Sequence, residues 1–494
     1  MDKTMKKMTL WLNSVLKVLF SIIIVGSIYN TCIASGSYDQ SRTGLVLLGI
    51  WTGLGLLFYK LRPRLSFKVL FTGILLISLD LRILWFLNID SLPVSDFGMM
   101  FYNGSQVIQG HTDMFKGINY FARFPHMSLT VMYFGLIQYL FADALSMTRL
   151  INIGLSLINV VLLYFIADQL FHDRPKSLGV MFIAGIFPPM IYYNNVFASE
   201  NLAMPLLLLS VLFYLQAVNG QKTIPFLCSG LLLSLAHLFR PLLYVVLVAY
   251  VLYALIYYQN HIQAKLKAVL SVVLSSLLPF VLISLILVQM GITQYPLWHG
   301  TEPLTVSVLK GTNISSGGGW NKEDASVFSQ FNGEYEAVNQ ECQRLIKQRF
   351  TETPPSGWLK FYLVKCSNQW SSGDFGGAYW AEAGRTDFKT QTLFAQGIHR
   401  GNKMAISMLS QGFLFHQMVW IVLLALSLGG LFRKEKSGAQ SLQLLYILFI
   451  GFALFYLITE SQSRYAYIAC WIFPILAMTA FRGESAKHKA GDEL

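Results

Sequence analysis

The sequence predicts an all-α polytopic membrane protein, and composition and run length support this prediction. The 494-residue chain is 54% hydrophobic and only 13% charged, and its mean hydropathy is +0.51. Such a chain is too apolar to close around a soluble core. Apolar runs of about 16 to 23 residues recur along it, close to the roughly 20 residues that a helix needs to cross a bilayer, whereas the strands of a membrane barrel alternate in shorter segments.

Twelve apolar segments predict about 12 membrane crossings, or 13 if a further segment also spans. The first follows three lysines like a signal peptide, but it is long and a second span follows at once, so we expect an uncleaved helix. The stretch from Met127 to Ala142 is the thirteenth candidate, but another crossing there would reverse the sidedness of the segments after it. We expect a re-entrant or interfacial helix instead. The predicted crossings are residues 10–34, 44–59, 69–89, 150–171, 178–192, 202–219, 225–239, 242–258, 268–290, 416–432, 442–458 and 465–481.

Short clusters of basic residues between the apolar runs predict the orientation, because positive charge marks cytoplasmic loops. The clusters place both termini inside and predict a multi-pass protein of the cell membrane. They also explain the net charge of +12 without a nucleic-acid partner. The clusters are Lys3/Lys6/Lys7, Lys60/Arg62/Arg64/Lys68, Arg174/Lys176, Lys222, Lys265/Lys267, Arg433/Lys434/Lys436 and Arg482/Lys487/Lys489.

Three regions follow from this topology. Residues 1–290 form an N-terminal transmembrane region whose first outer loop is 90–126, residues 291–415 form an extracytoplasmic loop subdomain, and residues 416–494 hold the last helices and a cytoplasmic tail. Within the subdomain, apolar residues at helical spacing predict an amphipathic helix from Asp324 to Thr351. Cys342 and Cys366 share this subdomain and either form a disulfide or stay free; the five cysteines show no metal-binding spacing.

Asp96 and Glu200 stand where apolar helices should leave the membrane on the outer side. A carboxylate there is costly and tends to persist where it works or is paired. One interpretation is that each acid caps the helix that follows it. The other is a catalytic pair, in which Asp96 acts as a general base and both carboxylates are candidate ligands of a divalent Mg or Mn ion.

Two arginines at predicted outer helix ends are candidates to bind a lipid phosphate. Arg240 and Arg464 each offer a planar fork of donors that matches phosphate oxygens. The alternative is that they snorkel or form salt bridges, for instance between Arg464 and Glu460 at i,i+4.

Other candidate substrate-binding residues lie in the outer loops. Arg123 and His126 flank a proline at the predicted mouth of the cavity, where a structural loop role is the alternative. Residues 317–319 are three glycines without the Gly-Lys-Ser/Thr of a phosphate-binding loop, so we expect a flexible turn that lets Trp320 and Asn321 approach a substrate. Asn313, just before this turn, is a further candidate substrate-binding residue. Asp80 and Arg82, inside the third predicted span, are not on one helical face, and each is expected to pair with another helix.

Taken together, these features resemble the GT-C superfamily of integral-membrane glycosyltransferases, in particular the bacterial branch similar to protein O-mannosyltransferases and the lipid A aminoarabinose transferase (glycosyltransferase family 39-like). The resemblance covers most of the chain and depends on the order and sidedness of its motifs. The motifs are Ser95-Asp96-Phe97, Tyr120 to His126, Ala198-Ser199-Glu200-Asn201, Arg240-Pro241, Gly311-Thr312-Asn313 to Trp320-Asn321, and Glu460 with Arg464-Tyr465.

The resemblance implies a GT-C-like bundle that transfers a sugar from a polyprenyl-phosphate carrier to a glycan, protein or lipid acceptor at the extracytoplasmic face. By analogy Asp96 would be the catalytic base of an inverting reaction, Glu200 its acidic partner, and Arg240 and Arg464 would hold the leaving phosphate. The chain departs from the eukaryotic mannosyltransferases because Ser-Asp-Phe replaces their adjacent Asp-Glu pair, and it lacks the Trp-Trp-Asp motif of oligosaccharyltransferases. The acceptor class therefore stays open.

Two other functions use the same kinds of residues. A transporter or flippase of a lipid-linked sugar also needs helices and interfacial arginines, but the chain shows no internal repeat. A polysaccharide polymerase or ligase would use lipid carriers without needing the acidic pair.

Overall fold

The computed structural model describes residues 3–34, 38–89, 91–383, 407–433 and 440–482. Throughout these ranges the secondary structure is helical, without a strand, which confirms the predicted fold class. Residues 384–406 of the loop subdomain and four of the predicted basic residues, Lys434, Lys436, Lys487 and Lys489, lie outside the described residues.

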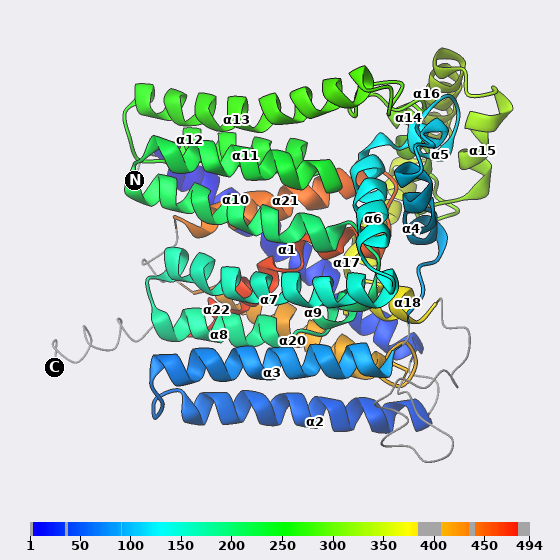
Figure 1. Cartoon of the computed structure of the whole chain (residues 1–494). Coiled ribbons are helices and arrows are strands. Elements are labelled where there is room, and N and C mark those ends of the chain that lie inside the picture. The colour runs from blue at the N-terminus through cyan, green and yellow to red at the C-terminus, as the bar shows by residue number, and fades with distance from the viewer. Residues whose placement is uncertain (1–2, 35–37, 90, 384–406, 434–439, 483–494) are drawn as a thin grey trace.

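Seven of the described helices are long and apolar enough to cross a membrane, and they run side by side in Figure 1. Each begins two to seven residues before one of the predicted spans and ends within two residues of the end of that span. The seven are α1 (Lys3–Ala34), α2 (Tyr38–Leu61), α3 (Phe67–Asn88), α7 (Ala144–Phe171), α10 (Glu200–Gly220), α13 (Ile262–Gln289) and α20 (Phe413–Gly430).

The other predicted spans are shorter or broken, and the total of 12 to 13 crossings stays a prediction. Three are apolar helices of fewer than 18 residues: α11 (Thr223–Phe239), α12 (Leu243–Ile256) and α21 (Leu442–Ile458). The span at 178–192 becomes α8 (Arg174–Gly185) and, after a 57° bend, α9 (Pro188–Tyr192) with the short η3 (Tyr193–Asn195).

A straight helix over 465–481 is not observed. This stretch consists of the 3-10 segment η4 (Ser463–Ala469) followed by α22 (Ile472–Met478). Pro474 has no N–H to extend a preceding helix but is tolerated in the first turn of a new one, which is where it lies in α22.

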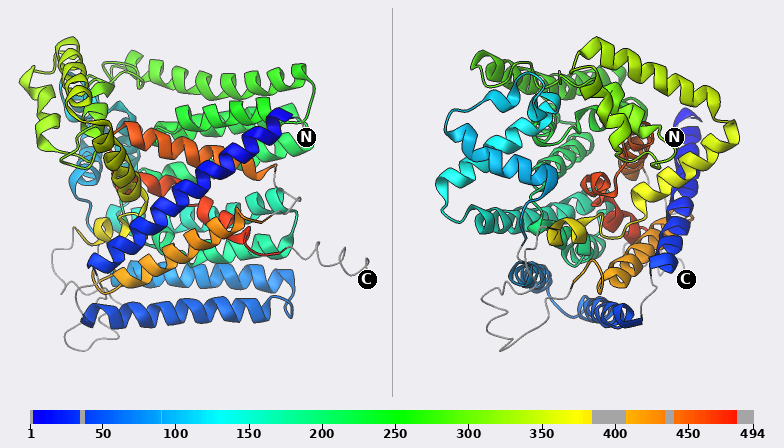
Figure 2. Two further views of the ribbon diagram at one scale, coloured as in Figure 1. Left: turned by 180° about the vertical axis from the view of Figure 1, so that it is seen from behind. Right: turned by 90° about the vertical axis from the view of Figure 1, so that its right-hand side faces the viewer.

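Burial separates a central layer of the bundle from helices at its edge. The most apolar part of α10 is 67% buried inside the protein, whereas that of α2 is only 6% buried. Figure 2 shows α21 and α22 within the bundle and α2 at its periphery. Arg82 of α3 is fully buried and donates to Ser156 Oγ and the carbonyl of Gly185, which confirms that it pairs with other helices. Asp80, on the same helix, is exposed.

The helices outside the bundle gather at one end, which we call the loop end (Figure 1). The opposite end, where α1 begins and short connections join α2 to α3, α7 to α8, α10 to α11 and α12 to α13, is the turn end. The loop-end segments are α4 (Ser95–Ile108), η1 (Asp113–Phe115), α5 (Tyr120–Arg123), η2 (Pro125–Met127), α6 (Ser128–Leu140), α14 (Leu304–Gly311), α15 (Lys322–Gln330), α16 (Tyr335–Glu352), α17 (Pro355–Trp370) and α18 (Gly377–Glu382).

Three expectations for these outer segments meet different outcomes. The stretch at 127–142 forms the short helix α6, which runs across the long helices in Figure 1, as expected for an interfacial helix.

The prediction of a single amphipathic helix at 324–351 is wrong. The structure has two helices there, α15 and α16, because Asn332 and Gly333 take positive φ angles of 51° and 74° in the turn between them. Cys342 and Cys366 are both free, so the disulfide option is also wrong.

Candidate functional site

Asp96 lies in the first turn of α4 and holds together residues from distant parts of the chain. Its Oδ2 accepts a hydrogen bond from Nη2 of Arg464 at 2.6 Å, across 368 positions of sequence, and its Oδ1 accepts one from the Tyr120 hydroxyl at 2.8 Å. The residue before it, Ser95, has a φ of 53°, a left-handed conformation that is uncommon for serine. The strained turn and the two donors fix the direction of the carboxylate.

The surroundings of Asp96 keep its carboxyl ionised. Burial raises its pKa, but the Arg464 guanidinium, the Tyr120 hydrogen bond and the charge of Arg240 together lower it further, so the pKa lies below its usual range. The Arg464 guanidinium in turn has its pKa lowered by burial and raised more by Tyr465 and Asp96, so its net shift is upward. The pair is therefore fully charged near neutral pH.

Glu200 forms the second acid–arginine pair of the site. It is the first residue of α10, and its side chain is only 3% exposed, compared with 24% for Asp96. Its Oε1 lies 3.3 Å from Nη2 of Arg240, at the end of α11. The N-cap positions are Val94 and Ser199, and among the described residues no backbone N–H donates to either carboxylate, so the helix-cap interpretation of the two acids is not supported.

Tyr465 contacts the arginines of both pairs. The guanidinium carbons of Arg240 and Arg464 each lie 5.2 Å from the centre of its ring. Its hydroxyl donates to Glu460 at 3.0 Å, and Lys310 Nζ lies 2.8 Å from the other oxygen of Glu460. The predicted Arg464–Glu460 pair is wrong, because Glu460 lies in non-helical chain between α21 and η4 and faces Lys310 instead.

Lys365 ties the loop subdomain to the segment that carries Arg464 and Tyr465. Its buried Nζ donates to the carbonyls of Gly311, Leu457 and Thr459 at 2.6 to 2.8 Å. A Cβ on Gly311 would lie 2.5 Å from the carbonyl oxygen of Ile458, so only glycine fits this approach. Sequence analysis missed Lys310 and Lys365; the signal was a lysine within an otherwise apolar helical pattern, in α14 and α17.

His126 lies near the site, in η2. Burial, followed by the charges of Arg240 and His237, lowers the pKa of its imidazole to about 3, although part of the residue reaches the surface. The ring is therefore neutral. It has the chemistry to accept or donate a hydrogen bond to a substrate, but it does not add positive charge.

Arg123 is placed by the structure as a link between the two outer loops. Its guanidinium hydrogen-bonds Glu302, with Nε at 2.9 Å, and its Cζ lies 4.3 Å from the centre of the Phe328 ring. Since Glu302 precedes α14 and Phe328 lies in α15, Arg123 joins the first loop to the loop subdomain. This geometry favours the structural role that was the alternative to substrate binding.

Asn313 and Trp320 occupy different environments on either side of the glycine turn. Asn313 is buried, donates to Asp324 at 2.9 Å and accepts from the backbone N–H of Ser316 at 3.1 Å, so it shapes the turn. Trp320, by contrast, is 57% exposed. Of the two, only Trp320 has a side chain that is open to a ligand.

The predicted metal site finds little support in the donor set. Asp96 and Glu200 each face an arginine that already neutralises the carboxylate. Across the described ranges there is also no group of three or more His, Cys, Asp or Glu side chains placed to hold a metal. These side chains therefore do not fit a divalent ion such as Mg or Mn.

The chemistry that this arrangement offers is the exchange of one anion for another. The positive charges of the two guanidiniums neutralise the negative charges of the two carboxylates close to the Tyr465 ring. An incoming phosphate would compete with the carboxylates for the arginines, since a charge-assisted bidentate contact suits both anions.

Residues 126–487 match a family described as conserved hypothetical integral membrane protein. The chain belongs to this family. The match includes Glu200, Arg240 and Arg464, while Asp96 precedes it. No curated protein matches the chain. The membrane location is thus established, whereas the resemblance to GT-C glycosyltransferases stays a prediction.

Proposed function

We propose that this protein is a glycosyltransferase that moves a sugar from a polyprenyl-phosphate carrier to an acceptor at the outer face of the cell membrane. The observation that carries the proposal is the pair of acid–arginine contacts, Asp96 with Arg464 and Glu200 with Arg240, which both lie next to Tyr465. A mechanism of phosphate departure and base-assisted attack needs these groups in one place.

The arginines suit the phosphate of a lipid carrier because of where they stand. Arg240 directly follows α11, and Arg464 lies in η4, both at the loop end of apolar helices. A carrier whose tail lies in the bilayer would bring its phosphate to this level. Two guanidiniums would then stabilise the negative charge that develops as the sugar leaves.

Asp96 is suited to act as the general base because the proton affinity of its carboxylate depends on Arg464. When Arg464 turns to the carrier phosphate, the carboxylate loses the partner that lowers its pKa, and its basicity rises. Tyr120 keeps it oriented. In the step itself the acceptor oxygen bonds to the anomeric carbon, the bond from that carbon to the phosphate oxygen breaks, and the acceptor proton passes to Asp96.

Glu200 is better suited to position Arg240 than to exchange protons. It is almost completely buried and its Oε1 faces the guanidinium. In this scheme Glu200 keeps Arg240 directed toward Tyr465 and the phosphate site. No metal and no nucleotide is part of the scheme.

The test is transfer by the purified protein in nanodiscs, with a fluorescent polyprenyl-phosphate sugar as donor and an envelope extract as the source of acceptor. We expect mass spectrometry to find free polyprenyl phosphate together with a glycosylated product. If sealed vesicles instead show the intact carrier crossing the bilayer without being consumed, the protein is a transporter or flippase. Transfer that is independent of Asp96 would favour the polymerase or ligase alternative.

A further inference from the structure

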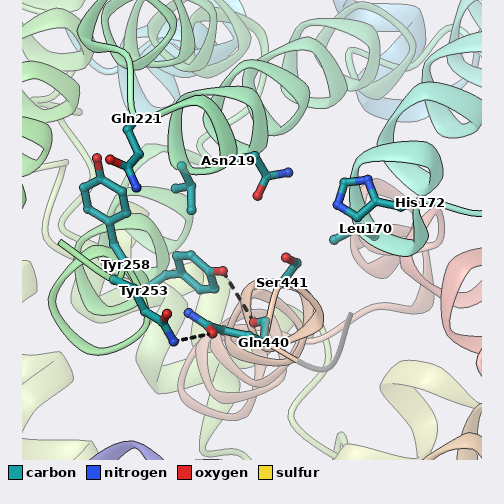
Figure 3. A pocket seen from close by; sticks show the side chains of 10 residues that line it. Leu170, His172, Asn219, Gln221, Tyr253, Tyr258, Gln440 and Ser441 are labelled. Atoms are coloured by element: carbon teal, nitrogen blue, oxygen red, sulfur yellow. Dashed lines mark hydrogen bonds between the residues drawn. The ribbon is translucent and has the colours of Figure 1, made fainter. Parts of the chain in front are cut away.

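A polar cavity lies at the turn end, at the opposite end of the bundle from Asp96. It has a volume of about 330 Å³, opens to the surface, and is lined by residues at the ends of α7, α10 and α12 and just before α21 (Figure 3). This volume is at the lower limit of the roughly 300–1,000 Å³ that is usual for small-molecule sites. It would accommodate one small polar ligand.

The cavity is polar but carries no charged side chain among its lining residues. Its polar groups are carboxamides, hydroxyls and one imidazole, supplied for example by Asn219, Gln221, Tyr258, Ser441 and His172. A charged ligand would find no counter-ion in this lining, whereas a neutral ligand with several hydroxyl groups would find both donors and acceptors.

Part of the lining is a fixed hydrogen-bonded frame. Gln440 accepts from Gln259 at 2.8 Å, and its own amide donates to the carbonyl of Tyr257. The Tyr253 hydroxyl donates to the carbonyl of Gln440 at 3.4 Å. Figure 3 shows this frame at the base of the cavity. Gln440, just before α21, is thereby held against the end of α12.

Two other lining residues adopt an unusual backbone conformation at equivalent places. His172 and Gln221 are the C-caps of α7 and α10, with φ angles of 49° and 53°. Glycine or asparagine is usual where a helix ends in this left-handed conformation. Here both positions carry larger polar side chains, and both of these line the cavity. Such outliers concentrate at functional sites.

These two side chains also retain hydrogen-bonding capacity. The Gln221 carbonyl oxygen accepts from Asn260 at 3.4 Å, but within the described ranges its NH₂ group has no acceptor. The His172 ring is likewise without a hydrogen bond to any described residue. Figure 3 shows the two residues on opposite sides of the cavity, so that a ligand between them would reach both.

We propose that this cavity binds an uncharged sugar unit, free or as part of a larger molecule. Carboxamides and hydroxyls match the vicinal hydroxyls of a sugar, and the absence of charge among the lining residues selects against sugar acids and amino sugars. The inference rests on this cavity alone and does not depend on transfer at Asp96.

Glycine substitutions test the site without straining the backbone. His172→Gly and Gln221→Gly remove the side chains at positions where the left-handed conformation favours glycine, so folding should be kept or improved. The probes are D-glucose, D-mannose and N-acetylglucosamine, with glucuronate and glucosamine as charged analogues. Saturation-transfer NMR on the full-length protein in nanodiscs measures binding, and a thermal scan measures folding.

We expect at least one neutral sugar to bind, each glycine variant to weaken it by tenfold or more, and neither charged analogue to compete. Gln263→Ala, which removes an exposed glutamine at the same end but outside the cavity, serves as the matched control and should bind normally. Equal binding by the glycine variants, equal binding of the charged analogues, or no binding of any neutral sugar overturns the proposal. Asp96→Asn should bind the sugar normally, so a failure of transfer and a failure of this site are distinguishable.

Discussion

The site at the loop end of the bundle is built on charged, paired side chains, whereas the side chains that line the turn-end cavity are uncharged. Asp96, Glu200 and Glu460 each contact a cation, and Tyr465 contacts both arginines. Around the turn-end cavity, amides and hydroxyls bond to one another and to backbone carbonyls. Paired charges at a membrane edge suit an anionic ligand, while neutral groups suit an uncharged one.

The largest effect in this comparison is expected from Asp96→Asn. If Asp96 is the general base, its loss should reduce the rate of transfer by about 100- to 10,000-fold. Carrier binding should stay roughly intact. Asp113→Asn, an exposed aspartate in the same outer loop, is the matched control and should leave the rate unchanged. A rate above one tenth of wild type would reduce Asp96 to a structural partner of Arg464.

The arginines should affect carrier affinity. Arg240→Ala or Arg464→Ala should weaken binding of the polyprenyl-phosphate sugar by on the order of 2 to 4 kcal/mol, because a charge-assisted contact is lost and a carboxylate stays unpaired. Lysine at either position should recover only part of the lost binding free energy, since its ammonium group lacks the planar, forked donors of a guanidinium. The measurement is the donor Kd on purified protein, with the exposed Arg344→Ala as control. Unchanged affinity in both alanine variants would place the phosphate site elsewhere.

A smaller effect is expected where the loop subdomain is attached. Lys365→Met leaves the carbonyls of Gly311, Leu457 and Thr459 without their donor, and each unsatisfied buried group costs about 1 to 3 kcal/mol unless water reaches it. The thermal unfolding midpoint should fall. Transfer should also fall, because the segment carrying Arg464 loses its anchor. Lys360→Met, on the exposed side of α17, should change neither quantity; a stable Lys365→Met protein would show that the anchor is dispensable.

The smallest effect is the pH dependence contributed by His126. Its folded pKa of about 3 lies below the ordinary value of 6.5, so the unfolded chain binds the proton more readily and stability falls as the pH drops from 6.5 toward 3. Asp96, whose pKa is also lowered, loses its contribution only below about pH 4. His126→Gln should therefore make the thermal unfolding midpoint less dependent on pH between pH 6.5 and 4.5. An equal slope in both proteins would mean that His126 takes up its proton freely when folded.

The class of protein, most of its helices, and the choice of the two acids and two arginines could all be predicted from the amino-acid sequence. These follow from local properties: the length of an apolar run, the position of basic residues and the cost of a charge near a bilayer. The same local reasoning failed at 465–481 and 324–351, where a proline and an Asn-Gly turn interrupt an otherwise helical pattern.

Which of these residues contact one another depends on how the helices and loops pack in three dimensions. Arg464 pairs with Asp96, 368 positions away, rather than with Glu460, four positions away, because the chain around Glu460 is not helical and Lys310 reaches it from another segment. Arg123 and Asn313 likewise proved to organise the loops. Sequence spacing predicts neighbours only within a regular helix, whereas the partners of a charge at the end of a bundle are set by how the other helices and loops pack around it.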